Sequence, residues 1–132
     1  MSAGLARYFG LEGKVVLITG ATRGIGLAMA EAFVAAGAAV VVSSEDAEAC
    51  HEVAARLQWE GGQALGVACD VREPDQLAAL VAAAEARFGR IDVLVCNAGV
   101  VPHAGPIGEA SDADYEQTFA VNLRHPLRLT GL

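Results

Sequence analysis

One stretch constrains the fold of this chain more than any other: Thr19-Gly20-Ala21-Thr22-Arg23-Gly24-Ile25-Gly26. An apolar run, 15–18, leads into it, and a helix-like run, 27–36, leads out. Its three glycines let the backbone turn tightly and approach a bulky partner closely. The helix that opens there directs free N–H groups and the positive end of its dipole toward whatever lies above. The order strand, glycines, helix therefore favours a site for the pyrophosphate of a dinucleotide, although a plain tight turn can carry the same glycines.

Apolar runs and helix-like runs alternate along the rest of the chain. The predicted strands are 15–19, 39–43, 63–69 and 91–96, and the predicted helices are 27–36, 46–60, 74–88 and a last one from Ser111 onward. Apolar runs without polar alternation are typical of parallel strands that are buried on both faces. The repeated β-α order predicts an α/β fold, a doubly wound parallel sheet with helices on both faces.

Three of the predicted helices carry apolar residues at helical spacing, and these residues should face the sheet. In the helix 74–88 they are Leu77, Leu80, Val81, Ala84 and Phe88. In the helix 46–60 they are Cys50, Val53, Ala54 and Leu57. In the helix after the glycines they are Ile25, Ala28, Met29, Ala32, Phe33 and Ala36.

The length of 132 residues is that of one domain. We expect this domain to span residues 14–132. Residues 1–13 before it read as an N-terminal arm, which four apolar or aromatic side chains could pin to the body: Leu5, Tyr8, Phe9 and Leu11.

Charge and cysteine content limit the partners and the compartment. The formal net charge is −7 and the nine Lys and Arg residues are scattered, which disfavours binding to nucleic acid or to an anionic membrane surface. No apolar run reaches membrane-spanning length, and residues 1–10 lack the apolar core of a signal peptide. Cys50, Cys69 and Cys96 read as free thiols of a reducing compartment, so the predicted location is cytoplasmic.

Polar or small residues follow the predicted strands, at the edge of the sheet where ligands of such folds bind. Ser44 and Glu45 follow the second strand, and Glu45 lies 19 positions after Gly26, near the spacing at which an acidic residue holds a ribose 2′-hydroxyl. A solvated loop carboxylate is the alternative. Asp70 follows the third strand and could accept from an adenine amino group, or serve as a cap-like loop residue. Asn97-Ala98-Gly99 follows the fourth, where small residues let a ligand lie against the backbone, although Asn97 alone would suit a turn.

Asn122 lies inside the last predicted helix, where Asn is a poor helix former. Pro126, four residues later, has no N–H, so the carbonyl of Asn122 lacks its helical donor. Two outcomes fit this pattern: a kink that frees the carbonyl for a water, or a helix that simply bends or ends near Arg124-His125-Pro126. His103 and His125 have no partner pattern for a metal, and no metal site is predicted.

Taken together, these motifs show a resemblance: the chain resembles the N-terminal half of a short-chain dehydrogenase/reductase. The matching segments are Thr19–Gly26, Asp70-Val71, Asn97-Ala98-Gly99 and Val121-Asn122-Leu123, and the match runs from about Leu11 to the last residue. The resemblance implies a Rossmann-like sheet of which this chain would supply about four strands, in the order 3-2-1-4. The C-terminal half of the domain would be absent.

The resemblance also implies a nicotinamide dinucleotide cofactor and the residues that hold it. Gly20, Thr22, Gly24, Ile25 and Gly26 would contact the pyrophosphate and adjoining riboses. Asp70 and Val71 would hold the adenine, and Asn97, Ala98 and Gly99 would support the ribose on the nicotinamide side.

Relatives that prefer NAD usually have an acidic residue where Ser44 stands, and relatives that prefer NADP often have a basic residue where Glu45 stands. Arg23 could attract a 2′-phosphate, but Glu45 would repel it at close range. NAD is therefore favoured over NADP.

The active site of this family consists of Asn, Ser, Tyr and Lys, and only Asn122 matches it. No Tyr-x-x-x-Lys is present, since Tyr8 and Tyr115 are followed four places on by Glu12 and Phe119. We therefore expect the NAD(P)-binding half of an oxidoreductase, which in the intact protein transfers hydride between the cofactor and a carbonyl or alcohol substrate; this chain alone should be inactive. The alternative is a non-catalytic dinucleotide-binding or assembly module.

The missing strands and helices would leave apolar surface uncovered. Residues 91–96 would form a long apolar edge strand, and Leu123, Leu127 and Leu129 would have no partner. This pattern predicts a homo-oligomer. The sequence does not name a substrate.

Overall fold

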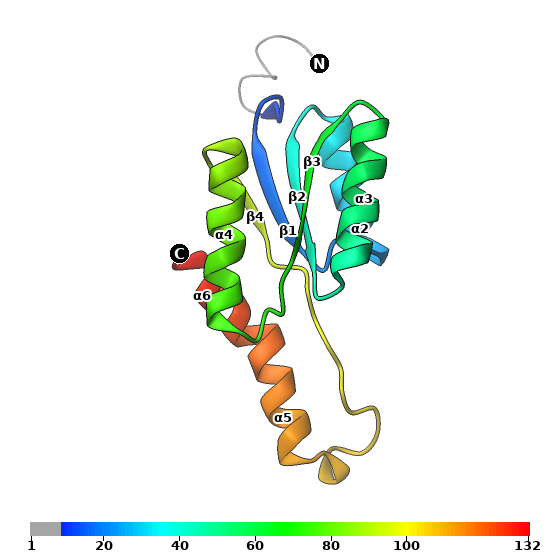
Figure 1. Cartoon of the computed structure of the whole chain (residues 1–132). Coiled ribbons are helices and arrows are strands. Elements are labelled where there is room, and N and C mark those ends of the chain that lie inside the picture. Colours follow the sequence, from blue (N-terminus) through cyan, green and yellow to red (C-terminus); the bar gives the residue numbers. More distant parts are fainter. Residues whose placement is uncertain (1–8) are drawn as a thin grey trace.

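The computed structural model describes residues 9–132, and a parallel sheet forms its middle layer (Figure 1). The strands are β1 (Val15–Thr19), β2 (Ala39–Ser44), β3 (Gln63–Ala68) and β4 (Val93–Val95), in the order β3-β2-β1-β4. All of the strand pairs are parallel, and the β1–β2 register runs from Val15 opposite Ala39 to Thr19 opposite Ser43. This arrangement confirms the predicted fold class and strand order.

Helices cover both faces of the sheet (Figure 1). Helices α2 (Gly24–Ala35) and α3 (Ala47–Trp59) lie on one face, and α4 (Pro74–Phe88) and α6 (His125–Thr130) lie on the other. The two faces bury alternate residues of β1, because side chains alternate along a strand. Val16 and Ile18 belong to one core cluster with Leu57, whereas Leu17 belongs to the other with Leu80.

The apolar stripe predicted for the helix at 46–60 is correct, but the stripe predicted for the helix after the glycines is only partly correct: Met29 and Phe33 pack against the core, whereas Ile25, Ala28, Ala32 and Ala36 are exposed. In α3, Cys50, Val53, Ala54 and Leu57 are all buried. In α2 the buried residues are Gly26 and Ala30, and Ile25 is 75% exposed. Almost every residue of α2 is apolar, so more than one phase of the helical repeat carries an apolar stripe and the sequence does not single out the buried one.

Strand β4 is shorter than the predicted strand 91–96. Asp92 precedes it and its carboxylate accepts from the Val15 N–H (2.9 Å), which a strand carbonyl would otherwise do. At the other end the Asn97 N–H donates to the Thr19 hydroxyl (3.1 Å) instead of to a strand partner. One backbone bond, from the Asp92 N–H to the Val15 carbonyl (2.9 Å), precedes β4, and side chains supply the other contacts at its two ends. This edge strand is only three residues long.

The elements after β4 extend beyond the carboxyl edge of the sheet before the chain returns to it (Figure 1). They are η1 (Ile107–Glu109), α5 (Asp112–Phe119), the π-helix η2 (Ala120–Arg124) and α6. Ser111 and Asp114 form a capping box at the start of α5. Leu129 is buried in the core beside α4, which corrects the expectation that it lacks a partner, whereas Leu123 and Leu127 are 58% and 72% exposed.

In the described part of the predicted arm, one of the side chains expected to pin it does so, and the Gly13 N–H also donates to the Gly37 carbonyl (3.0 Å). Leu11 packs against the core cluster on the α2 side, but Phe9 is 70% exposed and does not pin the arm. Leu5 and Tyr8 lie outside the described residues. Within residues 9–132, no helix combines the length and the apolar character needed to cross a membrane.

Candidate functional site

A cleft of about 650 Å³ lies at the carboxyl ends of the strands. This volume is within the range of small-molecule and cofactor sites. Twelve of the residues singled out from the sequence line it: Gly20, Thr22, Arg23, Gly24, Ile25, Ser44, Glu45, Asp70, Val71, Asn97, Ala98 and Gly99. Gly26 and Asn122 do not line the cleft, but each contacts a residue that does: Gly26 lies against Gly20, and Asn122 bonds to Val100.

The glycine-rich turn between β1 and α2 forms one wall of the cleft. Gly20 and Gly24 have φ angles of 64° and 57°, in the left-handed region that glycine adopts without strain. Gly26 is buried against the turn, and a Cβ placed on it would lie 2.6 Å from Asn97 Nδ2 and collide with the Gly20 carbonyl. Helix α2 begins at Gly24, and the side chain of its N-cap residue, Arg23, makes no capping hydrogen bond within the described chain. Its first-turn N–H groups thus face the cleft and suit an anionic ligand.

Asn97 connects the end of β4 to the glycine turn. Its side-chain Nδ2 donates to the carbonyl of Thr19 (3.1 Å) and to the carbonyl of Gly20 (2.9 Å). The backbone N–H groups of Asn97 and Ala98 both donate to the Thr19 hydroxyl, each at 3.1 Å. The two walls of the cleft are therefore fixed to each other, so Asn97 is more than the turn residue that its identity alone would suggest.

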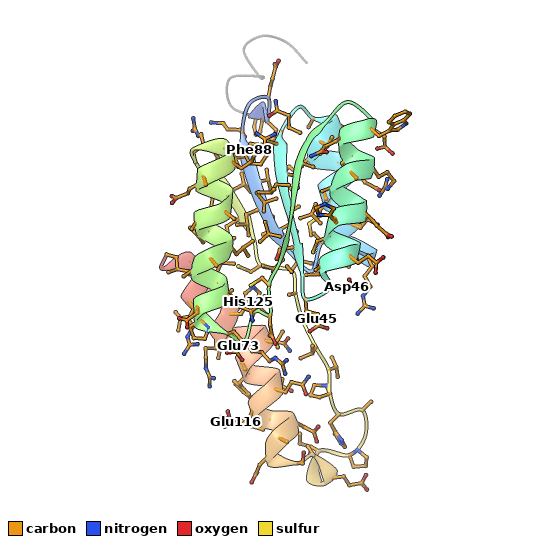
Figure 2. The ribbon with its side chains drawn as sticks, in the orientation of Figure 1. Glu45, Asp46, Glu73, Phe88, Glu116 and His125 are labelled. Atoms are coloured by element: carbon orange, nitrogen blue, oxygen red, sulfur yellow. The ribbon has the colours of Figure 1, made fainter. Side chains whose placement is uncertain are left out.

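Ser44, Glu45 and Asp46 form the end of the cleft after β2. The Ser44 backbone N–H donates to the Cys50 sulfur (3.1 Å), and the Ser44 hydroxyl accepts from the Asp46 N–H (3.2 Å). Asp46 also caps α3 by accepting from the Ala49 N–H (3.0 Å). Glu45 is exposed. Figure 2 shows Glu45 and Asp46 at the carboxyl end of the sheet, near the segment that follows β4.

Asp70 is held by Arg72, a residue that the sequence reasoning did not single out. Arg72 Nη2 lies 2.6 Å from Asp70 Oδ2, Nε lies 2.9 Å from Oδ1, and the Arg72 backbone N–H donates to Oδ1 (3.0 Å). These bonds hold the pKa of the Asp70 carboxyl below its ordinary value, so it is ionised at neutral pH. Asp70 is therefore a fixed acceptor in the wall of the cleft, beside the backbone of Val71.

Cys69 lines the cleft next to Asp70. Burial, with a smaller effect of the neighbouring Asp70 carboxylate, raises the pKa of the Cys69 thiol to about 11. The thiol is thus protonated at neutral pH and acts as an apolar wall rather than as a nucleophile.

Asn122 lies in the π-helix η2, and its side chain is bound to the segment after β4. Its Oδ1 accepts from the Val100 N–H (2.9 Å) and its Nδ2 donates to the Val100 carbonyl (2.8 Å). The sequence predicted a disturbance of the helix at this point, and the structure confirms one. The disturbance is one wide π turn, through which the helix continues into α6, so the predicted end of the helix near Arg124 is wrong.

Sequence reasoning missed several other residues of the site. Asp46, Ala49, Arg72, Val100 and Gln117 also line the cleft, as does Val121, which the sequence singled out only as part of the segment around Asn122. Gln117 and Val121 come from the helix that folds back over the strand ends, and nothing in their local spacing shows that return. Arg72 follows Asp70 by two positions, and that proximity was the available signal. No group of metal-ligating side chains occurs among residues 9–132.

Comparisons with known proteins identify the family of this chain. The family model described as short chain dehydrogenase matches residues 14–132. The D-threitol dehydrogenase of Mycolicibacterium smegmatis is 44% identical over 115 residues, which are 87% of this chain and 44% of that protein. A short chain dehydrogenase/reductase of Burkholderia phymatum, solved in complex with NAD, matches with a TM-score of 0.88 and 34% identity over 93% of this chain and 43% of that chain.

A metagenomic short-chain oxidoreductase, solved in complex with NADP, matches with a TM-score of 0.86 and 39% identity. The match covers 92% of this chain and 55% of that one. The chain thus spans about half the length of the proteins that it matches.

Proposed function

The chain belongs to the short-chain dehydrogenase family, as its motifs indicated, and from this membership we propose that it is the cofactor-binding half of an oxidoreductase. The proposed reaction of the intact protein is hydride transfer between a nicotinamide dinucleotide and a carbonyl or alcohol substrate. One observation carries the proposal: glycine turn, helix N-terminus, acidic residues and the Asn97 segment meet in one cleft at the strand ends. When bound, the cofactor would supply or accept the hydride.

The residues that line the cleft fit such a cofactor. Gly26 lets the backbone of the turn pack closely, and the first-turn N–H groups of α2 would bind the pyrophosphate, together with Gly20, Thr22, Gly24 and Ile25. The ionised Asp70 carboxylate and the Val71 backbone would hold the adenine. Asn97, Ala98 and Gly99 would support the ribose on the nicotinamide side. Asn122 would be the one catalytic residue of the family present in this chain.

We propose NAD rather than NADP as the cofactor. Glu45 and Asp46 are acidic residues at the ribose end of the cleft, and a 2′-phosphate there would be repelled. Two arginines also line the cleft. Arg72 is already paired with Asp70, so it offsets little of this negative charge. Arg23, which forms no ion pair found within the described chain, is the arginine that could attract a 2′-phosphate against the repulsion from Glu45 and Asp46.

Calorimetric titration with NADH and NADPH tests both proposals. We expect NADH to bind more tightly, and Glu45→Arg to reverse the order. Glu85→Arg makes the same charge change on the exposed surface of α4 and should leave the order unchanged. If neither dinucleotide binds, the proposed function is wrong. If NADPH binds the parent protein more tightly, only the cofactor preference is wrong.

These 132 residues alone should not catalyse hydride transfer, because they contain no Tyr-x-x-x-Lys. A non-catalytic dinucleotide-binding or assembly module has the same sequence property, and it remains the second candidate. The test is NADH oxidation with a panel of small ketones and aldehydes, in which no turnover above the protein-free rate is expected. Turnover by this chain would refute the expectation of inactivity.

We also propose that the chain forms a homo-oligomer in the cytoplasm. Tyr115, Phe119, Leu123 and Leu127 are exposed at every fourth position, so they form one apolar face across α5, η2 and α6. Three free cysteines accord with a reducing compartment. Sedimentation velocity should show an oligomer that Leu123→Arg with Leu127→Arg dissociates, whereas Ile107→Arg, also at an exposed apolar residue, should not. A monomeric parent protein would contradict the proposal.

A further inference from the structure

His125 is fully buried in the structure, although its side chain is polar and titratable. It lies at the junction of η2 and α6, near the carboxyl end of the sheet (Figure 2). Its Nδ1 is 2.9 Å from the Val121 carbonyl, and its Nε2 is 3.1 Å from the Thr19 hydroxyl. None of the cofactor contacts proposed above uses it.

The bonds of Thr19 fix the proton on this imidazole. The Thr19 hydroxyl oxygen accepts from the N–H groups of Asn97 and Ala98, and these two donors fill the two acceptor positions of a hydroxyl. The hydroxyl must then donate toward His125 Nε2, so Nε2 carries no proton. In a neutral imidazole the proton is then on Nδ1, from which it donates to Val121.

The Val121 carbonyl is available because of the π turn. In this turn the backbone N–H of His125 donates to Ala120, five residues back. The corresponding donor for Val121 would be residue 126, which is proline and has no N–H. The imidazole therefore satisfies a buried carbonyl that the π register and Pro126 together leave without a backbone donor.

We propose that His125 is a positioning residue for the nicotinamide side of the cleft. Its neutral imidazole orients the Thr19 hydroxyl, and that hydroxyl holds the backbone of Asn97 and Ala98 against the glycine turn. Asn97 in turn bonds the carbonyls of Thr19 and Gly20, so the unit sets the distance between the two walls. The inference rests on the proposed function, which assigns Asn97, Ala98 and Gly99 to the nicotinamide-side ribose. Burial lowers the pKa of His125, which agrees with a neutral ring.

Two conservative variants separate the two bonds of the imidazole. Asparagine places an amide near the position of Nδ1, so His125→Asn can keep the bond to Val121 and loses the one to Thr19. Glutamine reaches farther and places its amide oxygen near Nε2, so His125→Gln can keep the acceptor for Thr19 and loses the donor to Val121.

Binding of NADH and of 5′-AMP by each variant distinguishes positioning from general stability, because 5′-AMP lacks the nicotinamide half. We expect His125→Asn to weaken NADH binding about tenfold, the size of one buried hydrogen bond, and to leave 5′-AMP binding within about twofold. His125→Gln should bind NADH nearly as the parent protein does. Unchanged NADH binding by His125→Asn, or an equal loss for both ligands, would overturn the inference.

The position of the imidazole proton supplies a test that needs no ligand. ¹⁵N-resolved NMR of the His125 ring should show a protonated Nδ1 and an unprotonated Nε2 near pH 7. A proton on Nε2 would overturn the inference whatever the ligands do. If the NMR result is as expected and the parent protein binds neither NADH nor 5′-AMP, the proposed function fails and the assignment of a nicotinamide side fails with it.

Discussion

Gly26 gives the sharpest test of how the glycine turn is built. The φ angle of Gly26 is not positive, so alanine is allowed there by backbone conformation. The obstacle is space: a Cβ would lie 2.6 Å from Asn97 Nδ2 and 2.8 Å from the carbonyl carbon of Gly20, with the Gly20 oxygen closer still. Since two of these three atoms belong to the backbone of the glycine turn, Gly26→Ala cannot be accommodated by a side-chain rotation.

The expected cost follows from that geometry. Overpacking a well-packed site costs about 1–3 kcal/mol, and we expect a loss near the upper end, about 3 kcal/mol in the free energy of unfolding. Gly24→Ala meets no atom of residues 9–132 within 4 Å, but its φ of 57° costs roughly 1–2 kcal/mol for alanine. Gly108→Ala has neither problem and should change stability by less than about 1 kcal/mol, in the stabilising direction.

Urea unfolding followed by circular dichroism measures this series. Trp59 is 91% exposed and therefore reports unfolding poorly by fluorescence. NADH titration of the folded variants should show the largest loss of affinity for Gly26→Ala, because its collision displaces both Gly20 and Asn97. If Gly26→Ala is as stable as Gly108→Ala and binds NADH as tightly, the turn is not limited by space at Gly26 and the reasoning is refuted.

Three further predictions concern single side chains. Ser43→Ala should leave the free energy of unfolding unchanged or raise it by up to about 1 kcal/mol, because the buried Ser43 hydroxyl has no hydrogen-bond partner in the described chain. Thr19→Val, at the residue opposite Ser43 on β1, should lower the free energy of unfolding by about 1–3 kcal/mol. Equal effects of the two substitutions in chemical denaturation would contradict this. Arg72→Gln should reduce the loss of stability on acidification. The pKa of Asp70 is held below its ordinary value in the folded protein, so the stability that its ionised carboxylate contributes is complete above about pH 4 and is lost as the pH falls through the folded pKa. If the urea midpoints of Arg72→Gln fall on acidification as steeply as those of the parent protein, Arg72 is not the cause. Burial raises the pKa of Cys69 to about 11, so its thiol should resist iodoacetamide at pH 8 in the folded protein and react once urea is added. Peptide mass mapping measures this reaction. Rapid alkylation of Cys69 in the folded protein would contradict its assignment as a buried wall of the cleft.

The fold was predictable because, in most segments, the spacing of apolar residues distinguishes a buried strand from a helix. Val15–Thr19 and Ala39–Ser43 are continuous apolar runs, and such runs form strands that are buried on both faces. The stripe of α3 was predictable because polar residues lie between Cys50, Val53 and Leu57. The stripe of α2 was not, since apolar residues there occupy all faces of the helix.

The candidate site was predictable where it depends on the order of elements and not where it depends on distant contacts. The strand ends bring Gly20, Ser44, Asp70 and Asn97 to one edge, as parallel topology requires. The ion pair between Asp70 and Arg72 and the burial of His125 depend on rotamers and on the return of the last helices, which no local pattern encodes.

The bond between Thr19 and His125 joins residues 106 positions apart, and this separation has a consequence for the order in which the molecule assembles. Closing a loop of that length costs roughly 4 kcal/mol of chain entropy beyond a constant, whereas the β1–β2 and β2–β3 pairs close loops of 24 residues, which cost roughly 3 kcal/mol on the same scale. Strand β4 pairs with β1 across 77 residues and belongs with the late contacts. We therefore expect strands β1, β2 and β3 and their helices to form early and the walls of the cleft to lock together last. On the ribosome, the pocket would stay unfinished until the chain has been made through His125, although strands β1 and β2 had been synthesised long before.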